Sequence, residues 1–198
     1  MKTTLQQATW VAVGCGALML AACSISEKGS GGDKQVNIEA PGASVHVDTG
    51  ATANDSGIPL YPGAQEKHGT VDDKNRAHVN LNMPFLKMKV VALKFTSGDA
   101  PEKVLAFYRN KLGMYGTVVE CKGGGQDVEV ASGRGLDSPV QCDKSSHHSD
   151  EISLKVGSEG NQHVVSVKPS GKGSEFSLVY LHLSNKKNDD DYSGRQPS

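Results

Sequence analysis

The sequence has little of several features that define classes of proteins. Only 5% of its 198 residues are aromatic, which argues against a broad carbohydrate-stacking surface or an aromatic ligand cage. Its formal net charge is -1, so it lacks the basic excess that nucleic-acid binding requires. It also lacks a Gly-x-Ser-x-Gly elbow and the spacing of a P-loop. These absences predict a protein that is not an enzyme and that carries no cofactor.

The main apolar run without a charged side chain lies near the N-terminus, from Trp10 to Ala22. It is too short to cross ~30 Å of hydrocarbon as a helix. Lys2 provides a basic start, and small residues end the run. This combination is typical of a secretory signal, so residues 1–22 are predicted to be a cleaved signal peptide.

The end of that run, Leu20-Ala21-Ala22-Cys23, is similar to the lipobox of bacterial lipoproteins. The resemblance implies cleavage before Cys23, a diacylglyceryl group on its thiol, and a further fatty chain such as palmitate on the new amino group. About two chains hold a protein stably on a membrane. Ser24 in the next position implies the outer membrane, facing the periplasm, if the host is Gram-negative. An ordinary secretory signal followed by an incidental cysteine is the alternative.

Cleavage leaves two further cysteines, Cys121 and Cys142, in the mature chain. In an oxidising envelope we expect them to form a disulfide, and closing a loop of about 21 residues contributes roughly 3 kcal/mol in the chain-entropy model. Two buried free thiols are one alternative. A metal site is another, although the Cys-x-x-Cys spacing is absent.

Composition divides the mature chain into a linker, a domain and a tail. Residues 23–57 are expected to be a lipid-anchored linker, flexible over 24–35 and again over 49–57. Within it, residues 36–48 alternate apolar and polar side chains around Pro41-Gly42, which predicts a β-hairpin that docks on the domain or stays partly ordered. The charged tail, 185–198, is expected to be disordered.

Residues 58–184 are predicted to form an α+β domain. The entry segment IPLYPGAQ is expected to pack Leu60 and Tyr61 on the core. Alternating segments at 77–84 and 87–97 predict an antiparallel hairpin. DEISLKVG, HVVSVKPSG and SEFSLVYLHL predict three more strands, and the last is the most apolar, so we expect it in the interior of the sheet.

One main helix is expected over about 99–113, packed on one face of the antiparallel sheet. Asp99 and Glu102 are predicted to form a capping box, with Pro101 in the first turn. Gly113 is predicted to end the helix in a left-handed conformation. An apolar stripe at helical spacing is expected to face the sheet, formed by Val104, Leu105, Tyr108 and Leu112.

The Tyr-Pro-Gly-Ala entry, the hairpin and the helix VLAFYRNKLG together resemble an uncharacterised domain of bacterial envelope lipoproteins. The resemblance covers roughly residues 57–184. It implies a small α+β fold and transfers no activity and no functional residue.

The densest group of metal-ligating side chains is His147, His148, Asp150 and Glu151, which His163 or Cys142 would have to complete. A solvated polar turn before the next strand is the favoured interpretation. The function expected from the sequence is therefore a non-enzymatic binding or assembly module on the membrane, with an envelope protein as partner and the glycine-rich loop 123–138 as a candidate contact. A small envelope enzyme or metal-binding protein that uses this cluster is the alternative.

Overall fold

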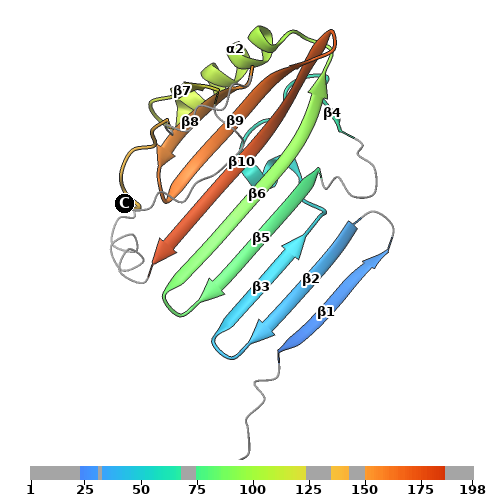
Figure 1. The fold of residues 1–198 in the computed structure, drawn as a ribbon, viewed down its shortest axis with the longest axis vertical. Helices are drawn as coiled ribbons and strands as arrows, with labels where there is room; N and C mark the ends of the chain where they lie inside the picture. The colour runs from blue at the N-terminus through green and yellow to red at the C-terminus, as the bar shows by residue number, and fades with distance from the viewer. Residues whose placement is uncertain (1–22, 31–32, 68–74, 124–134, 143–149, 186–198) are drawn as a thin grey trace, which may run out of the picture.

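The computed structural model describes residues 23–30, 33–67, 75–123, 135–142 and 150–185. Ten antiparallel strands form one sheet, in the order β1-β2-β3-β5-β6-β10-β9-β8-β7, with β4 paired to β6 (Figure 1). The strands are β1 (Ser24–Ser30), β2 (Asp33–Ala40), β3 (Ala43–Asp48), β4 (Gln65–Glu66), β5 (Arg76–Met83), β6 (Leu86–Ser97), β7 (Val119–Lys122), β8 (Ile152–Ser158), β9 (Asn161–Ser170) and β10 (Gly173–Asn185).

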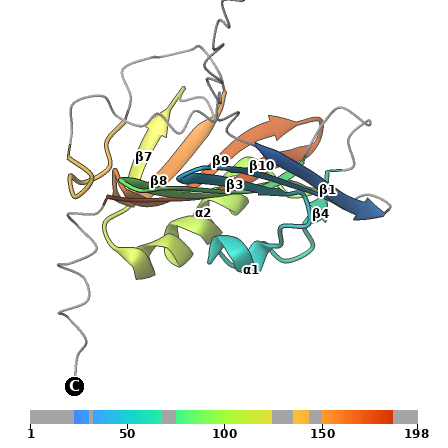
Figure 2. The same cartoon turned by 90° about the horizontal axis from the view of Figure 1, so that it is seen from below.

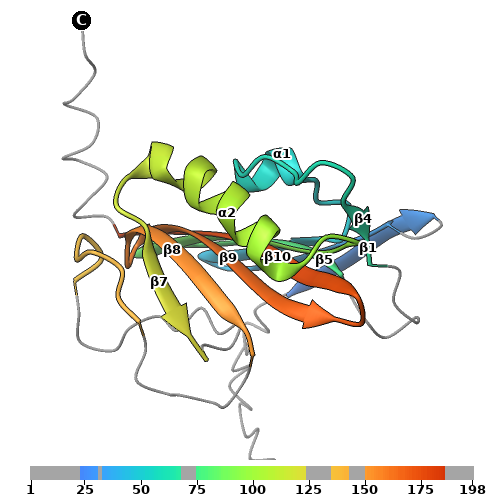
Figure 3. The same cartoon turned by 90° about the horizontal axis from the view of Figure 1, so that it is seen from above.

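Both α-helices, α1 (Ala53–Ser56) and α2 (Pro101–Leu112), lie on one side of the sheet, as Figures 2 and 3 show. We call this the helix side and the opposite one the open side. Helix α2 packs on β8, β9 and β10, whereas α1 contacts β6 and β10. The predicted α+β class, with an antiparallel sheet and one main helix, is confirmed.

The core lies between the sheet and α2. Four helix residues are fully buried: Val104, Leu105, Tyr108 and Leu112, the stripe predicted from the sequence. Opposite them, the strands contribute alternate residues, as expected for a sheet with one face in the core. These are Val91, Leu93, Phe95, Leu154, Val156, Val165, Val167, Phe176 and Leu178.

The predicted capping box of α2 is wrong. The N-cap is Ala100, and no side chain caps the helix. Asp99 instead accepts hydrogen bonds from the Tyr61 hydroxyl at 2.8 Å and from Lys103 Nζ at 3.0 Å. Asp99 therefore fixes the entry segment to the helix, because a tertiary hydroxyl competes with the backbone amides for the same carboxylate.

The predicted left-handed stop at Gly113 is also wrong. Gly113 has right-handed dihedral angles (φ -56°, ψ -20°), and the chain continues as a 3-10 turn, η1 (Gly113–Tyr115). The positive φ falls at Gly116 (φ 136°), where the chain turns toward β7. The extra turn brings Tyr115 over the sheet, a tertiary contact that local sequence does not encode.

The hairpin predicted at 36–48 is present as β2 and β3, and Gly42 adopts φ 81° in its turn. It docks on the main sheet through pairing of β3 with β5. The expected flexible tether is wrong over residues 24–30, which form β1 on the outer edge of β2. Backbone pairing supplies this strand, because its only large apolar side chain, Ile25, is 67% exposed.

The second expected linker, 49–57, also has a defined structure. Ala51 and Ser56 are buried, and a capping box between Thr52 and Asp55 starts α1. Asp55 Oδ2 accepts hydrogen bonds from the Thr52 amide at 2.8 Å and from its hydroxyl at 2.7 Å. In the entry segment that follows, Ile58 and Tyr61 are buried and Leu60 is 41% exposed, so the predicted apolar pair is corrected.

The last strand lies inside the sheet, as predicted. β10 pairs with β6 on one side and with β9 on the other. The expected hairpins β5–β6 and β8–β9–β10 are present in register. The predicted signal peptide, 1–22, lies outside the described residues, and so do residues 186–198 of the predicted tail. Asn185, the first residue of that tail, ends β10 instead.

Candidate functional site

Cys23 lies directly before β1, as an exposed free thiol. Lipidation at this position would connect the anchor to the outermost strand of the sheet, with no spacer between them. In the part of the chain that is described, no helix has both the length and the apolar character needed to cross a membrane.

The predicted disulfide between Cys121 and Cys142 is present, with the two Cα atoms 5.4 Å apart. It connects β7 to the segment 135–142, which runs beside β8. That segment pairs with β8 through a bridge between Pro139 and Ser158, and the Val140 amide donates to the Gly157 carbonyl at 3.2 Å. The disulfide therefore attaches the edge strand β7 to the segment 135–142, and its role in this part of the fold is structural.

The metal ligands considered from the sequence do not come together where they can be described. His147 and His148 lie outside the described residues, Asp150 is exposed, and Cys142 is in the disulfide. His163 is enclosed by aromatic rings on the helix side. Over the described ranges, no group of three or more His, Cys, Asp or Glu side chains is arranged to hold a metal ion.

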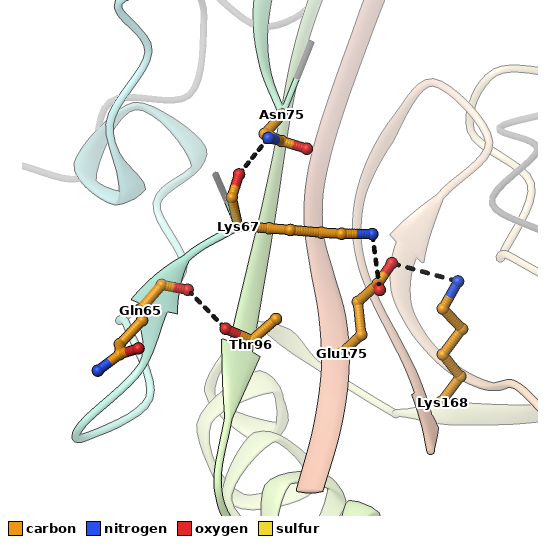
Figure 4. A network of polar contacts seen from close by, with 6 residues as sticks. All are labelled: Gln65, Lys67, Asn75, Thr96, Lys168 and Glu175. Carbon is orange, nitrogen blue, oxygen red and sulfur yellow. Dashed lines mark hydrogen bonds and ion pairs between the residues drawn. The ribbon is translucent and has the colours of Figure 1, made fainter. Parts of the chain in front are cut away.

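A polar network around the buried Glu175 (Figure 4) lies on the open side, at the end of the sheet where β10 begins. Glu175 accepts from Lys67 Nζ at 2.9 Å and forms an ion pair with Lys168 Nζ at 3.2 Å. Burial alone would raise the pKa of Glu175, but the two lysines outweigh it and hold this pKa below its ordinary value. The network keeps a carboxylate charged while it is almost inaccessible to solvent.

Glu151, which precedes β8, is buried close to this network. Its Oε1 has no hydrogen-bond partner among the described residues. Burial raises the pKa of Glu151, and the negative charge of Glu175 adds to the effect, against stabilisation of the ionised form by Ser166 and Lys168. Glu151 is close to His147 and His148 in the sequence, but its carboxylate is packed against the open side of the sheet. It is therefore not an exposed metal ligand.

His163 stands on the helix side of β9 between two tyrosine rings. Its ring centroid lies 4.2 Å from that of Tyr115 and 4.8 Å from that of Tyr180. The Tyr115 hydroxyl donates to the Gly57 carbonyl, which fixes the outer ring. Burial lowers the pKa of His163, so the stacked imidazole is held neutral.

Beyond the helices, the helix side of the sheet becomes polar. Over β2, β3 and β5 it presents a polar shelf, which consists of Gln35, Asn37, His46, Asp48, His78 and Asn80. Its side chains bond across strands: His46 Nδ1 bonds Asn37 Oδ1, and Gln35 Nε2 donates to Asp48 at 3.2 Å. The pKa of His78 is lowered by burial and then by the Lys89 charge. The shelf offers imidazole, amide and carboxylate groups, which suit recognition by hydrogen bonding.

The open side of the same strands carries the opposite character. Alternation and register bring nine apolar side chains to it, which we call the aliphatic face. They are Ile25, Val36, Ile38, Val45, Val47, Val79, Leu81, Met88 and Val90. Ile25 and Ile38 are 67% and 36% exposed, and the others are half-buried within the sheet. None of the nine belongs to the described core beneath α2.

Neither surface was identified from the sequence. The alternation in 36–48 and 77–90 indicates that each hairpin has an apolar face. The pairing of β3 with β5 determines that the two apolar faces lie on the same side of the sheet. Phe107 and Tyr108, the adjacent aromatics, pack in the core region, where their rings contact Tyr61. They are therefore not a recognition surface.

No protein-family model, no curated protein and no solved structure matches the chain.

Proposed function

We propose that this chain is a lipid-anchored protein of the bacterial envelope, and that its β1–β5 region serves as a non-enzymatic binding or assembly module. The lipobox ending at Cys23 supports the anchor, and the exposed thiol before β1 is compatible with it. In a Gram-negative host, Ser24 favours the outer membrane facing the periplasm.

The observation that carries the binding role is an extension of the sheet past both described helices. Helices α1 and α2 contact β6, β8, β9 and β10, whereas β1, β2, β3 and β5 extend past them (Figure 1). A sheet that only had to enclose its own core would not need this extension. The polar shelf on it offers directional hydrogen-bonding groups, which is what a specific partner contact uses.

The anchor is tested by labelling cells with palmitate and by mass spectrometry of the mature N-terminus. The wild-type chain should begin at Cys23 and carry fatty chains, and Cys23→Ala should carry none. An uncleaved leader, or an unmodified Cys23, would contradict the anchor.

The binding role is tested by affinity capture of the acylated chain from detergent-solubilised envelopes. We expect an enriched partner that Cys23→Ala fails to recover and that His46→Ala on the polar shelf recovers poorly. Lys103→Ala, at a 70% exposed side chain on α2, is the matched control and should recover it fully. Equal recovery by both surface variants would contradict the assignment of the shelf, and no enrichment by the acylated chain would contradict the module itself.

A further inference from the structure

The aliphatic face is continuous from the edge of the sheet to its centre. In one row, Ile25 pairs with Ile38, Ile38 with Val45, Val45 with Leu81, and Leu81 with Met88. A second row runs parallel to it. It consists of Val36, Val47, Val79 and Val90. The largest contiguous apolar patch on a monomer is often functional.

The position of Cys23 relates this face to the membrane. Side chains alternate along a strand, and Cys23 stands two residues before Ile25. If the register of β1 with β2 is continued by one residue, Cys23 falls opposite Ala40, on the open side. Fatty chains on the Cys23 thiol would therefore leave the protein on the side that carries the aliphatic face.

The size of the face argues against a second copy of the chain as its occupant. Five strands about 4.8 Å apart and two side-chain rows about 7 Å apart give an area of about 350 Å². A stable dimer buries about 800 Å² on each partner, so this face is too small by about a factor of two. A lipid-anchored protein can contact the bilayer through a smaller area, because its fatty chains already supply the affinity for the membrane.

The face also has a polar boundary. The network of Lys67, Lys168 and Glu175 (Figure 4) lies on the same side. It lies at the end of the sheet opposite the β5–β6 turn, since Glu175 pairs with Thr96 near the end of β6. Among the described strand residues of the open side, this end carries charged side chains and the opposite end carries none, so the described part of this side is polar toward one end of the strands.

We infer that the aliphatic face rests on the bilayer that holds the lipid anchor, with β1 and the β5–β6 turn nearest the hydrocarbon and the polar shelf turned toward the aqueous space. This inference rests on the proposed lipidation of Cys23. It assigns the aliphatic face and the polar shelf to different tasks, contact with lipid on the open side and contact with a partner on the helix side.

Tryptophan fluorescence tests the inference, because Trp10, the only tryptophan, lies in the leader and the mature chain has none. Leu81→Trp places a probe on the aliphatic face, and Asn82→Trp places its matched control on the next residue of β5, on the helix side. The acylated proteins are reconstituted in vesicles of phosphatidylethanolamine and phosphatidylglycerol with brominated acyl chains. Bromine should quench Leu81→Trp more than Asn82→Trp by about twofold or more, since quenching requires entry into the acyl region.

Flotation of the vesicles reports the anchor independently of the face. Flotation without selective bromine quenching overturns the inference and leaves the anchor intact, whereas loss of flotation overturns both. Iodide in the aqueous phase separates the remaining outcomes. Protection of Leu81→Trp from iodide without bromine quenching shows that protein covers the face, and equal iodide quenching of the two probes shows that water does. Both results overturn the inference, and Val45→Trp, opposite Leu81 on β3, repeats the test if Leu81→Trp does not fold.

Discussion

Two buried glutamates on the open side differ in their surroundings. Glu175 is held between Lys67 and Lys168, and its pKa is lowered. Glu151 is buried with an unpaired oxygen, and its pKa is raised. A lowered native pKa stabilises the fold when the group is ionised, and a raised one destabilises it, so the two residues should have opposite effects on stability.

Glu151→Gln is expected to stabilise the fold at pH 7 by roughly 0.5–1 kcal/mol, because it removes a charge that burial disfavours. The native pKa is above the unfolded one, so the destabilisation is complete above the native pKa and vanishes as the pH falls below the ordinary glutamate value. Urea unfolding of wild type and variant at pH 7 and pH 4 measures this. A variant less stable than wild type at pH 7 would contradict it.

Glu175→Gln should behave in the opposite way and cost about 1–2 kcal/mol at pH 7, since it leaves the two lysines without their carboxylate. The contribution of Glu175 is complete above the unfolded pKa and is lost as the pH falls through the lowered native pKa. The same unfolding series, extended below pH 4, follows that loss. A cost that stays constant over the acid range would show that packing, and not charge, is responsible.

The Tyr108 hydroxyl is a buried acceptor for the backbone. The Tyr61 amide donates to it at 3.1 Å. Tyr108→Phe leaves that amide unpaired in the core and is expected to cost about 1–3 kcal/mol in thermal or denaturant unfolding. Tyr61→Phe is the matched control: it removes a bond to Asp99, whose side chain is 40% exposed, and it should cost less. Equal costs would contradict the role of burial.

At the residue scale, the sequence predicted a contact correctly where only one pair of side chains could form it. With Cys15 in the predicted signal peptide and Cys23 predicted to carry lipid, only Cys121 and Cys142 were left to pair, so the predicted disulfide had a single form. Prediction failed where several partners compete for one group. Asp99 has the correct spacing for a cap, but the Tyr61 hydroxyl, 38 residues away in sequence, takes its carboxylate.

Among the elements, β7 depends most on a covalent bond. It is a four-residue edge strand, held by β8 and by the disulfide to the segment 135–142. Cys121→Ser/Cys142→Ser is expected to lower the unfolding free energy by roughly 3 kcal/mol, as the chain-entropy model gives for a loop of this length. Unfolding of the wild type with and without a reductant should give the same difference. No change on reduction would contradict it.

Most strands were predictable because alternation is a local signal. The hairpins β2–β3, β5–β6 and β8–β9–β10 have it, and all were expected. β1 was not, because SISEKGS has no alternation of apolar residues and pairs through its backbone alone. Short α1 was missed for a related reason: its capping box lies within a stretch of small and polar residues that is also typical of linkers.

For the whole molecule, the two sides of the sheet differ along its width. Over β6 and β8–β10 the helix side is buried beneath α2, and on β9 and β10 the open side is buried as well, at Val164, Val179, Leu181 and Leu183. Over β1, β2, β3 and β5 the apolar residues lie on the open side and are half-buried or exposed. The sequence contains both patterns, but it cannot relate them without the register that joins β3 to β5 and β6 to β10. Most of the strands that form the candidate surfaces could therefore be predicted from the sequence, but the surfaces themselves could not.

This division predicts unequal local stability. β1, β2 and β3 contribute no side chain to the described core beneath α2, whereas β6, β9 and β10 contribute several. Backbone amides of β1–β3 should therefore exchange with solvent deuterium faster than those of β9 and β10, by a factor that grows toward β1. Exchange of the Cys23→Ala mature chain in solution, read by NMR or mass spectrometry, measures this. Uniform protection across the sheet would contradict it.

The place of β10 has a consequence for how the chain is made. It is the last strand in the sequence, and in the described sheet it alone joins β6 to β9. The pairing of β6 with β10 connects distant parts of the chain, such as Leu86 with Asn185, and such pairing is slow to form. The two halves cannot unite until β10 itself has been synthesised. If the chain is exported unfolded, as the proposed signal peptide implies, this order of assembly keeps the sheet incomplete while the chain passes through a translocation channel.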